Sequence, residues 1–166
     1  MGLFSFIKNA GAKVFGIGKT DEEEAAEAAA ERKAEIAASN AKAAASMAET
    51  VNDLGLEIDG LNISIDGDIA TITGKALNQA TREKIILVVG NTAGISGVDD
   101  QMDVENKEPE ARFYTVEKGD YLSKISKKMY GDAMKYNVIF EANKPMLTDP
   151  DKIYPGQVLR IPHLDK

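Results

Sequence analysis

The fold of the C-terminal part of this chain follows from one stretch, Phe113-Tyr114-Thr115-Val116-Glu117-Lys118-Gly119-Asp120-Tyr121-Leu122-Ser123-Lys124-Ile125-Ser126. It opens on a strand pattern and passes into a helical pattern at about 122–130. A second helical pattern at about 135–143 ends at Asn143, and the closing strand lies in Tyr154-Pro155-Gly156-Gln157-Val158-Leu159-Arg160-Ile161-Pro162. The sequence therefore predicts a β-α-α-β unit over residues 112–163.

The region before this unit alternates between strand and helix patterns. Residues 61–65 and 69–73 alternate like half-buried strands, and Asp66-Gly67 between them is typical of a tight hairpin turn. A helix is expected at about 78–89, followed by a last strand at 98–104. With the helix that precedes residue 51, the order is α-β-β-α-β, which predicts a small sheet with its helices on one face.

Charge and aromatic content divide the 166 residues into regions that differ in composition. The formal charge is +3 over residues 1–20, −12 over 21–106 and +2 over 107–166, and no aromatic residue occurs from 16 to 112. All five prolines lie at or after Pro109. We therefore expect two independently built α+β domains, at 51–106 and 112–163, joined by a polar linker at 107–111.

Two helical segments are expected ahead of these domains. Leu3, Ile7, Ala10 and Val14 recur at helical spacing, which predicts a short apolar helix within residues 1–20. Residues 21–50 are rich in Ala, Glu and Lys, the strongest helix formers, but contain few large apolar side chains. This second segment is predicted to be a solvated, partly frayed helical extension.

Composition argues against several classes of protein. There is no cysteine and one histidine, His163, so disulfides, zinc–thiolate sites and multi-histidine metal sites are excluded. The net charge of −7 and pI near 4.8 disfavour a nucleic-acid binder. No phosphate-binding loop or nucleophile elbow is present, so we expect a non-enzymatic protein. No segment reaches the ~20 apolar residues of a membrane span, and a cytoplasmic location is expected.

Residues 50–105 resemble the BON domain in the order of a hairpin with Gly67, then Gly74, a helix, and the run from Gly90 to Asp99. The stretches 113–126 and 154–162 resemble the opening and the close of a LysM domain. The two domains in this order, behind Met1-Gly2-Leu3-Phe4-Ser5-Phe6, resemble a family of small bacterial cytoplasmic potassium-binding proteins. The resemblance implies a K⁺ sensor or buffer that becomes more compact when it binds the ion.

Backbone carbonyl oxygens can replace the hydration shell of K⁺, and unpaired carbonyls gather at helix C-termini. Glycines mark two such ends, at 7–11 and 89–94, and Gly90 is expected to require a positive φ. The resemblance implies that the K⁺ ligands are the backbone carbonyls of Ile7, Ala10, Ala12, Gly90, Thr92 and Ile95. Ordinary helix termination is the alternative explanation of these glycines.

The resemblance to LysM domains also implies an alternative function, the binding of N-acetylglucosamine-containing glycan or peptidoglycan. The matching positions are Gly119, Asp120, Tyr121, Leu122, Lys152, Ile153 and Tyr154. Tyr121 departs from the family pattern, which usually has Thr or Ser there. We expect the face of the LysM-like domain that carries these positions mainly to contact the BON-like domain.

Two further alternatives carry less weight. The basic, apolar N-terminus and the BON domain could associate with a membrane surface, but the −12 charge of residues 21–106 opposes anionic lipid. A divalent metal could bind Asp66 and Asp68, or the Asp99, Asp100 and Asp103 group, but their spacing is not that of an EF-hand. A monomer is expected, because no obvious apolar seam is exposed.

Overall fold

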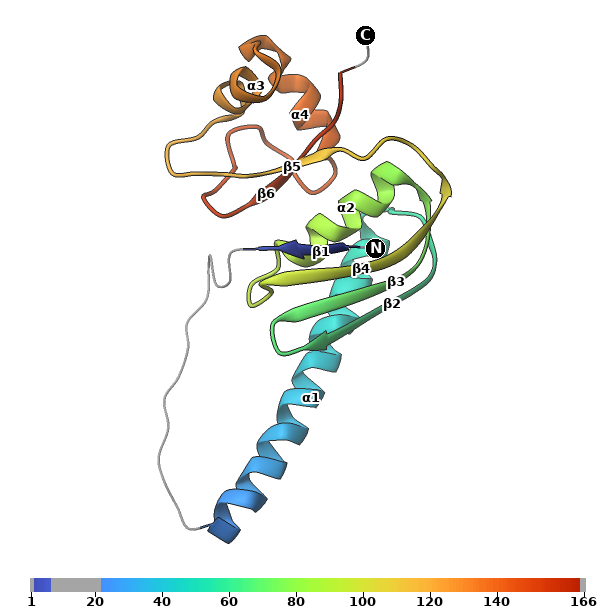
Figure 1. Cartoon of the computed structure of the whole chain (residues 1–166), viewed down its shortest axis with the longest axis vertical. Helices are drawn as coiled ribbons and strands as arrows, with labels where there is room; N and C mark the ends of the chain where they lie inside the picture. The colour runs from blue at the N-terminus through green and yellow to red at the C-terminus, as the bar shows by residue number, and fades with distance from the viewer. Residues whose placement is uncertain (1, 7–21, 165–166) are drawn as a thin grey trace.

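The computed structural model describes residues 2–6 and 22–164, and these residues form two packed units (Figure 1). We call residues 2–6 and 22–106 the sheet unit and residues 112–163 the ribbon unit. The sheet unit consists of β1 (Gly2–Ser5), α1 (Glu22–Asp53), β2 (Ile58–Asp66), β3 (Ile69–Asn78), α2 (Gln79–Gly90) and β4 (Gly97–Asn106). The ribbon unit consists of β5 (Arg112–Thr115), α3 (Leu122–Tyr130), the 3₁₀ helix η1 (Ala133–Lys135), α4 (Tyr136–Ala142) and β6 (Val158–Ile161). Helices and strands thus mix in both units, as an α+β fold requires.

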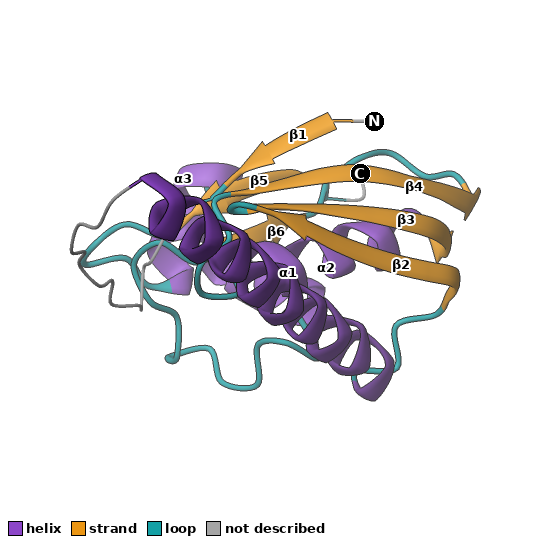
Figure 2. Ribbon diagram, turned by 90° about the horizontal axis from the view of Figure 1, so that it is seen from below, coloured by secondary structure: helices purple, strands orange, loops and turns teal. Residues whose placement is uncertain are grey.

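The four-stranded sheet has the strand order β1-β4-β3-β2. The β2–β3 hairpin turns at Gly67, whose φ of 63° suits glycine, and Asp66 pairs with Ile69 across the turn. Strands β3 and β4 are parallel, so α2 serves as the crossover between them. Figure 2 shows α1 and α2 on the same face of this sheet. The apolar core lies between these two helices and the sheet, and it includes Ile72, Ile86 and Val98.

The N-terminus corrects one prediction, because residues 2–5 form a strand where a helix was expected. β1 pairs antiparallel with β4, with Phe4 opposite Val98. The decisive pattern is a period of two: Phe4 and Phe6 pack against the core, whereas Leu3 is 70% exposed. An available strand edge on β4 therefore outweighs the helical spacing of the apolar residues, and the rest of the predicted helix lies outside the described residues.

Helix α1 is more than the solvated extension that its composition predicts. It runs without interruption from Glu22 to Asp53. Its last three turns bury Ala44, Met47 and Val51 in the core, while Ile36 in the preceding part is 57% exposed. The spacing of these three positions places them on one helical face, and that face contacts the sheet. Composition alone missed this because two of the three buried residues are small or flexible.

Helix α2 begins at a polar cap and is covered on both sides. The Asn78 side chain accepts a hydrogen bond from the Thr81 N–H at 2.8 Å, a typical N-cap. Ile85, Ile86 and Val89 face the sheet-unit core. In Figure 1 the opposite side of α2 lies against the ribbon unit. This placement explains why residues 85–89 of α2 form a continuous apolar run rather than a single stripe.

The ribbon unit pairs β5 with β6 in antiparallel register, with Tyr114 opposite Leu159. Its core contains Ile125 of α3, Ile139 of α4, and Leu159 and Ile161 of β6. The helix predicted at 122–130 has those bounds, and α3 ends at Gly131, whose φ is 75°. The second helical pattern is divided between η1 and α4, with Asn143 as its C-cap. Within residues 2–6 and 22–164, no helix is both long and apolar enough to cross a membrane.

Candidate functional site

The candidate site is the loop that follows α2, residues 91–96, which we call the α2–β4 loop. Helix α2 ends at Gly90, and Asn91 is its C-cap with φ −80° and ψ 0°. The Thr92 hydroxyl donates to the Val88 carbonyl at 2.9 Å, and the Thr92 N–H donates to the Val89 carbonyl at 3.2 Å. Carbonyl oxygens at this end carry the negative end of the helix dipole, so the loop is a favourable place for a cation.

Three separate segments of the chain are attached to this loop. The Ser96 N–H donates to the Asp68 carbonyl in the β2–β3 turn at 2.8 Å. The Phe6 N–H donates to the Ser96 carbonyl at 2.6 Å, which ties the N-terminal segment to the same residue. Asn91 bonds to β6 of the ribbon unit. The α2–β4 loop is therefore the place where the sheet, the N-terminus and the ribbon unit meet.

The structure places half of the predicted carbonyl ligands together. Gly90, Thr92 and Ile95 lie at the end of α2 and in the loop, and the Ile95 N–H donates to the Thr92 carbonyl at 3.2 Å. The Ile95 side chain is buried, which anchors this turn in the core. The other half of the set, Ile7, Ala10 and Ala12, lies outside the described residues. The chain leaves the described strand β1 at Phe6, directly beside the loop.

The structure gives Gly90 a different role from the one predicted. It is the last residue of α2 and does not have a positive φ; in this loop the glycine with positive φ is Gly94, at 89°. A Cβ atom on Gly90 would lie 1.8 Å from Cζ of Phe6. The absence of a side chain therefore makes room for an aromatic ring from the N-terminal segment. The sequence could not show this, because the contact joins residues more than 80 positions apart.

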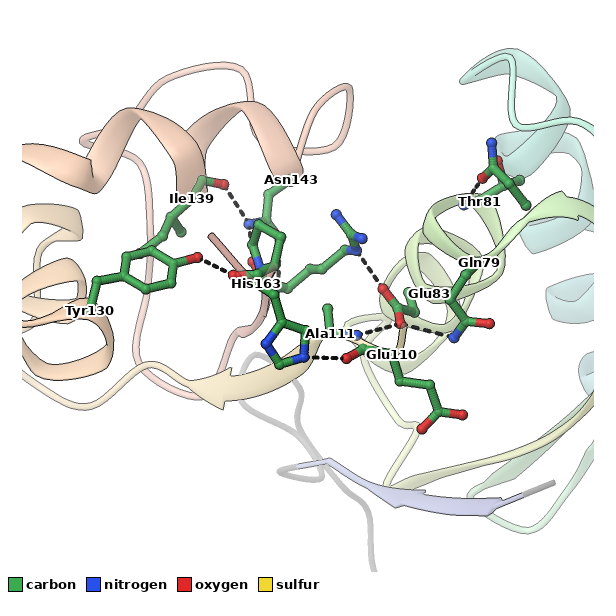
Figure 3. A network of polar contacts seen from close by, with 12 residues as sticks. Gln79, Thr81, Glu83, Glu110, Ala111, Tyr130, Ile139, Asn143 and His163 are labelled. Atoms are coloured by element: carbon green, nitrogen blue, oxygen red, sulfur yellow. Dashed lines mark hydrogen bonds and ion pairs between the residues drawn. The ribbon is translucent and has the colours of Figure 1, made fainter. Parts of the chain in front are cut away.

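A network of polar contacts joins α2 to the linker and to β6, and Figure 3 shows it from close by. Glu83 is buried, and its Oε1 accepts from the Ala111 N–H at 2.8 Å and from Gln79 Nε2 at 2.9 Å. Its Oε2 accepts from Arg160 Nε at 2.5 Å. The Glu83 carboxylate thus fixes both the linker and the ribbon unit to α2. The pKa of the neighbouring Lys84 is lowered, first by partial burial and then by the positive charge of Arg160.

The residues of the glycan alternative lie in several different environments. The side chains of Asp120 and Leu122 are inside the ribbon unit, where the Asp120 carboxylate accepts from the Tyr114 hydroxyl at 2.8 Å and the Glu117 N–H at 2.9 Å. Burial opposes ionisation of Asp120, but these hydrogen bonds and Lys124 outweigh it and lower its pKa. Lys152 and Tyr154 instead line a cavity of about 510 Å³ between the units, with Leu87 and Asn91. Tyr121 is 58% exposed.

Two of the acidic residues weighed as a divalent-metal site, Asp99 and Asp100, have other partners. Asp100 is 1% exposed and bonds to Arg82 at 2.7 Å and to the Met102 N–H at 3.0 Å. Asp99 accepts from the Gln101 side chain at 2.8 Å. Within the part of the chain that the structure describes, no three His, Cys, Asp or Glu side chains are grouped closely enough to hold a metal ion.

Two residues at this junction, Asn91 and Glu83, were not singled out from the sequence. Asn91 directly follows the glycine that ends α2, and a polar residue at that position is a weak sign of a capping or docking role. Glu83 is a charged residue among the buried positions of an apolar helix, which is a stronger sign that it has a fixed partner. In neither case could the sequence identify the partner, because both bond to β6.

Comparison with known proteins identifies relatives of both units. The sequence model of the BON domain matches residues 39–106, and that of the LysM domain matches residues 114–162. The potassium binding protein Kbp of Escherichia coli is 46% identical over 164 residues, 98% of this chain and 99% of that protein. An uncharacterized protein of Deinococcus radiodurans is 53% identical over 49 residues, 30% of this chain and 19% of its own length. The uncharacterized protein YqbP of Bacillus subtilis is 40% identical over 58 residues, 30% of this chain and 26% of its own length.

Proposed function

The chain belongs to the family of the potassium binding protein Kbp, with a BON domain followed by a LysM domain, and we propose that it binds K⁺ through backbone carbonyl oxygens. The carbonyls come from the α2–β4 loop and from the N-terminal segment after Phe6. One observation carries this proposal: the Phe6 N–H donates to the Ser96 carbonyl, so the end of the first described segment, residues 2–6, lies at the α2–β4 loop. Residues from two distant parts of the chain can then surround one ion.

The ligand set that we propose is Ile7, Ala10, Ala12, Gly90, Thr92 and Ile95. Gly90 is the last residue of α2, where helix-end carbonyls concentrate negative potential, and Thr92 and Ile95 lie in the loop that follows it. K⁺ is large and loosely hydrated, and a shell of neutral carbonyls suits it better than a cluster of carboxylates, which favours Mg²⁺ or Ca²⁺. The proposed site therefore needs a loop of fixed shape rather than acidic side chains, and the contacts at Ser96, Thr92 and Ile95 give the loop that shape.

Compaction follows from the position of the loop between the units. The ion would hold the residues after Phe6 against the loop, and Phe4 in the preceding strand β1 contacts Phe113 of the ribbon unit, with ring centroids 5.4 Å apart. Asn91 and Glu83 connect α2 with β6. A ligand that binds the docked arrangement more tightly shifts the population toward it. We therefore propose a cytoplasmic, monomeric K⁺ sensor or buffer in which ion binding favours contact between the BON and LysM domains.

The binding role involves no catalysis in our proposal, and the two matched domain families are not enzymatic. Nucleic acid, membrane and glycan are not proposed as partners. For the glycan alternative, the side chains of Asp120 and Leu122 are engaged inside the ribbon unit, so these two positions do not line an open groove. Retention of the protein on peptidoglycan or chitin would restore that alternative.

Thermal unfolding in KCl and in NaCl at matched ionic strength tests the proposed function. A single-site ligand at 100 times its Kd adds about 2.7 kcal/mol to the free energy of unfolding. For a chain of this size each kcal/mol raises Tm by roughly 2–4 °C, so we expect a K⁺-specific rise of about 5–10 °C. Coincident melting curves in the two salts would contradict K⁺ binding.

Carbonyl ¹³C chemical shifts locate the site without changing the sequence. Backbone carbonyls cannot be removed by side-chain mutation, so a K⁺ titration of uniformly ¹³C-labelled protein is the direct measurement. We expect saturable shifts at Gly90, Thr92 and Ile95, and at Ile7, Ala10 and Ala12. The carbonyl of Ile125, in the ribbon-unit core, serves as the control. Shifts confined to residues outside the proposed ligand set would move the site elsewhere.

A further inference from the structure

The outer edge of β6 is closed by two asparagine side chains that make the same pair of hydrogen bonds. In an antiparallel ribbon, alternate residues direct both N–H and C=O away from the partner strand, and an edge of this kind needs other partners. At Arg160 the partner is Asn143 of the ribbon unit, which accepts from the N–H at 2.8 Å and donates to the carbonyl at 2.9 Å. At Val158 the partner is Asn91 of the sheet unit, whose side chain accepts from the Val158 N–H at 2.8 Å and donates to the Val158 carbonyl at 2.9 Å.

The second of these contacts belongs to the α2–β4 loop. Asn91 stands between Gly90 and Thr92, whose carbonyls belong to the proposed ligand set. Two hydrogen bonds to one backbone unit fix both the position and the rotation of the Asn91 side chain. Because Asn91 is also the C-cap of α2, the peptide groups on either side of it are held in a definite orientation relative to β6.

Resting on the proposed function, we propose that Asn91 is a positioning residue through which docking of the ribbon unit sets the affinity of the K⁺ site. Asn91 aligns the neighbouring carbonyls when its side chain is bonded to Val158, and releases them when the ribbon unit moves away. Every amino acid has a backbone carbonyl, so the side chain at position 91 acts on the ion through the shape of the loop.

Linkage makes this coupling reciprocal. If docking of β6 increases K⁺ affinity, then K⁺ increases the stability of the docked state by the same factor. Protection of the Val158 N–H from exchange reports the stability of the docked state directly, because the acceptor of this N–H is Asn91. Hydrogen exchange at Val158 should therefore become slower when K⁺ replaces Na⁺, whereas exchange at Arg160, whose acceptor lies in the ribbon unit itself, should respond less.

The test compares Asn91→Leu and Asn91→Ala with wild type in the full-length chain. Leucine keeps a similar branched shape and makes neither hydrogen bond. Asn106→Ala is the matched control, because Asn106 also donates to a backbone carbonyl, that of Leu77 at 3.0 Å, but within the sheet unit. K⁺ affinity is measured by calorimetric titration at constant ionic strength, and Val158 exchange is measured by NMR in both salts.

We expect both Asn91 variants to bind K⁺ about tenfold more weakly, equivalent to about 1.4 kcal/mol, and to lose the K⁺-dependent protection of Val158. Asn106→Ala should retain wild-type affinity. Wild-type affinity in Asn91→Leu, or an equal loss in Asn106→Ala, would overturn the coupling role. A wild-type protein without any K⁺ response would refute the proposed function itself, and that result is visible before any variant is made. Far-UV circular dichroism of each variant shows whether it is folded.

Discussion

The Phe6 ring lies directly against the Cα atom of Gly90, so that a Cβ atom at position 90 would overlap the ring at 1.8 Å. This contact joins the end of the first described segment to the end of α2. The backbone confirms the arrangement, since Phe6 bonds to Ser96 in the loop that follows. Through this one aromatic ring, residues 2–6 are held beside the α2–β4 loop.

Gly90→Ala should displace the Phe6 ring and weaken both the fold and the ion site. Overpacking in a core costs typically about 1–3 kcal/mol, and we expect a loss of free energy of unfolding in this range. Displacement of Phe6 should also reduce the extra stability that K⁺ gives. Urea unfolding in KCl and in NaCl measures both effects.

Two controls separate this contact from a simple backbone effect. Gly94→Ala, in the same loop, has φ 89° and no atom within 4 Å of the added Cβ, so it carries only the left-handed strain of roughly 1–2 kcal/mol. In the background of Phe6→Ala, Gly90→Ala should cost much less than in wild type, because the ring is gone. Additive effects of the two substitutions would contradict the contact.

Glu83→Gln should destabilise the docked protein strongly. The Glu83 carboxylate accepts three hydrogen bonds, and its partner Arg160 is only 13% exposed. Removing one member of a buried ion pair costs about 3–5 kcal/mol, because the other charge stays without compensation. Glu141→Gln is the control: its pair with Lys144 is exposed on both sides and should contribute below about 1 kcal/mol. Equal unfolding midpoints in urea for the two variants would contradict this assignment.

Asp120→Asn should change the acid end of the stability profile. Since the folded protein lowers the pKa of Asp120, this residue contributes stability above its unfolded pKa of about 3.9, and the contribution is lost as the pH falls through the folded value. The difference in free energy of unfolding between wild type and Asp120→Asn should therefore be constant near pH 7 and shrink below about pH 4. Urea titrations at several pH values measure it. A difference that is independent of pH would show that the charge of Asp120 is not involved.

Asn78→Ala should destabilise α2 at its first turn. The Asn78 side chain accepts from the Thr81 N–H, and loss of an N-cap costs typically about 1 kcal/mol. Asn78→Ser, which can cap, should recover most of that loss, and thermal unfolding distinguishes the two variants. An alanine variant as stable as wild type would mean that this cap contributes nothing.

Much of the fold follows from local sequence patterns. The alternation at 61–65 and 69–73, the turn at Gly67 and the helix at 122–130 were all predictable, because backbone preference and side-chain periodicity act over a few neighbouring residues. The α+β class and the order of the two domains were also evident from the sequence and its resemblance to known families.

Contacts between distant residues were decided by the tertiary structure alone. Residues 2–5 became a strand because β4 offers an open edge, and the Phe6 ring occupies the space that a side chain at position 90 would need. Asn91 meets Val158 across 67 positions, and Glu83 meets Arg160 across 77. The physical reason is that a local pattern indicates which surface of a segment is apolar or polar, whereas the residues that contact this surface are brought next to it only when the chain folds.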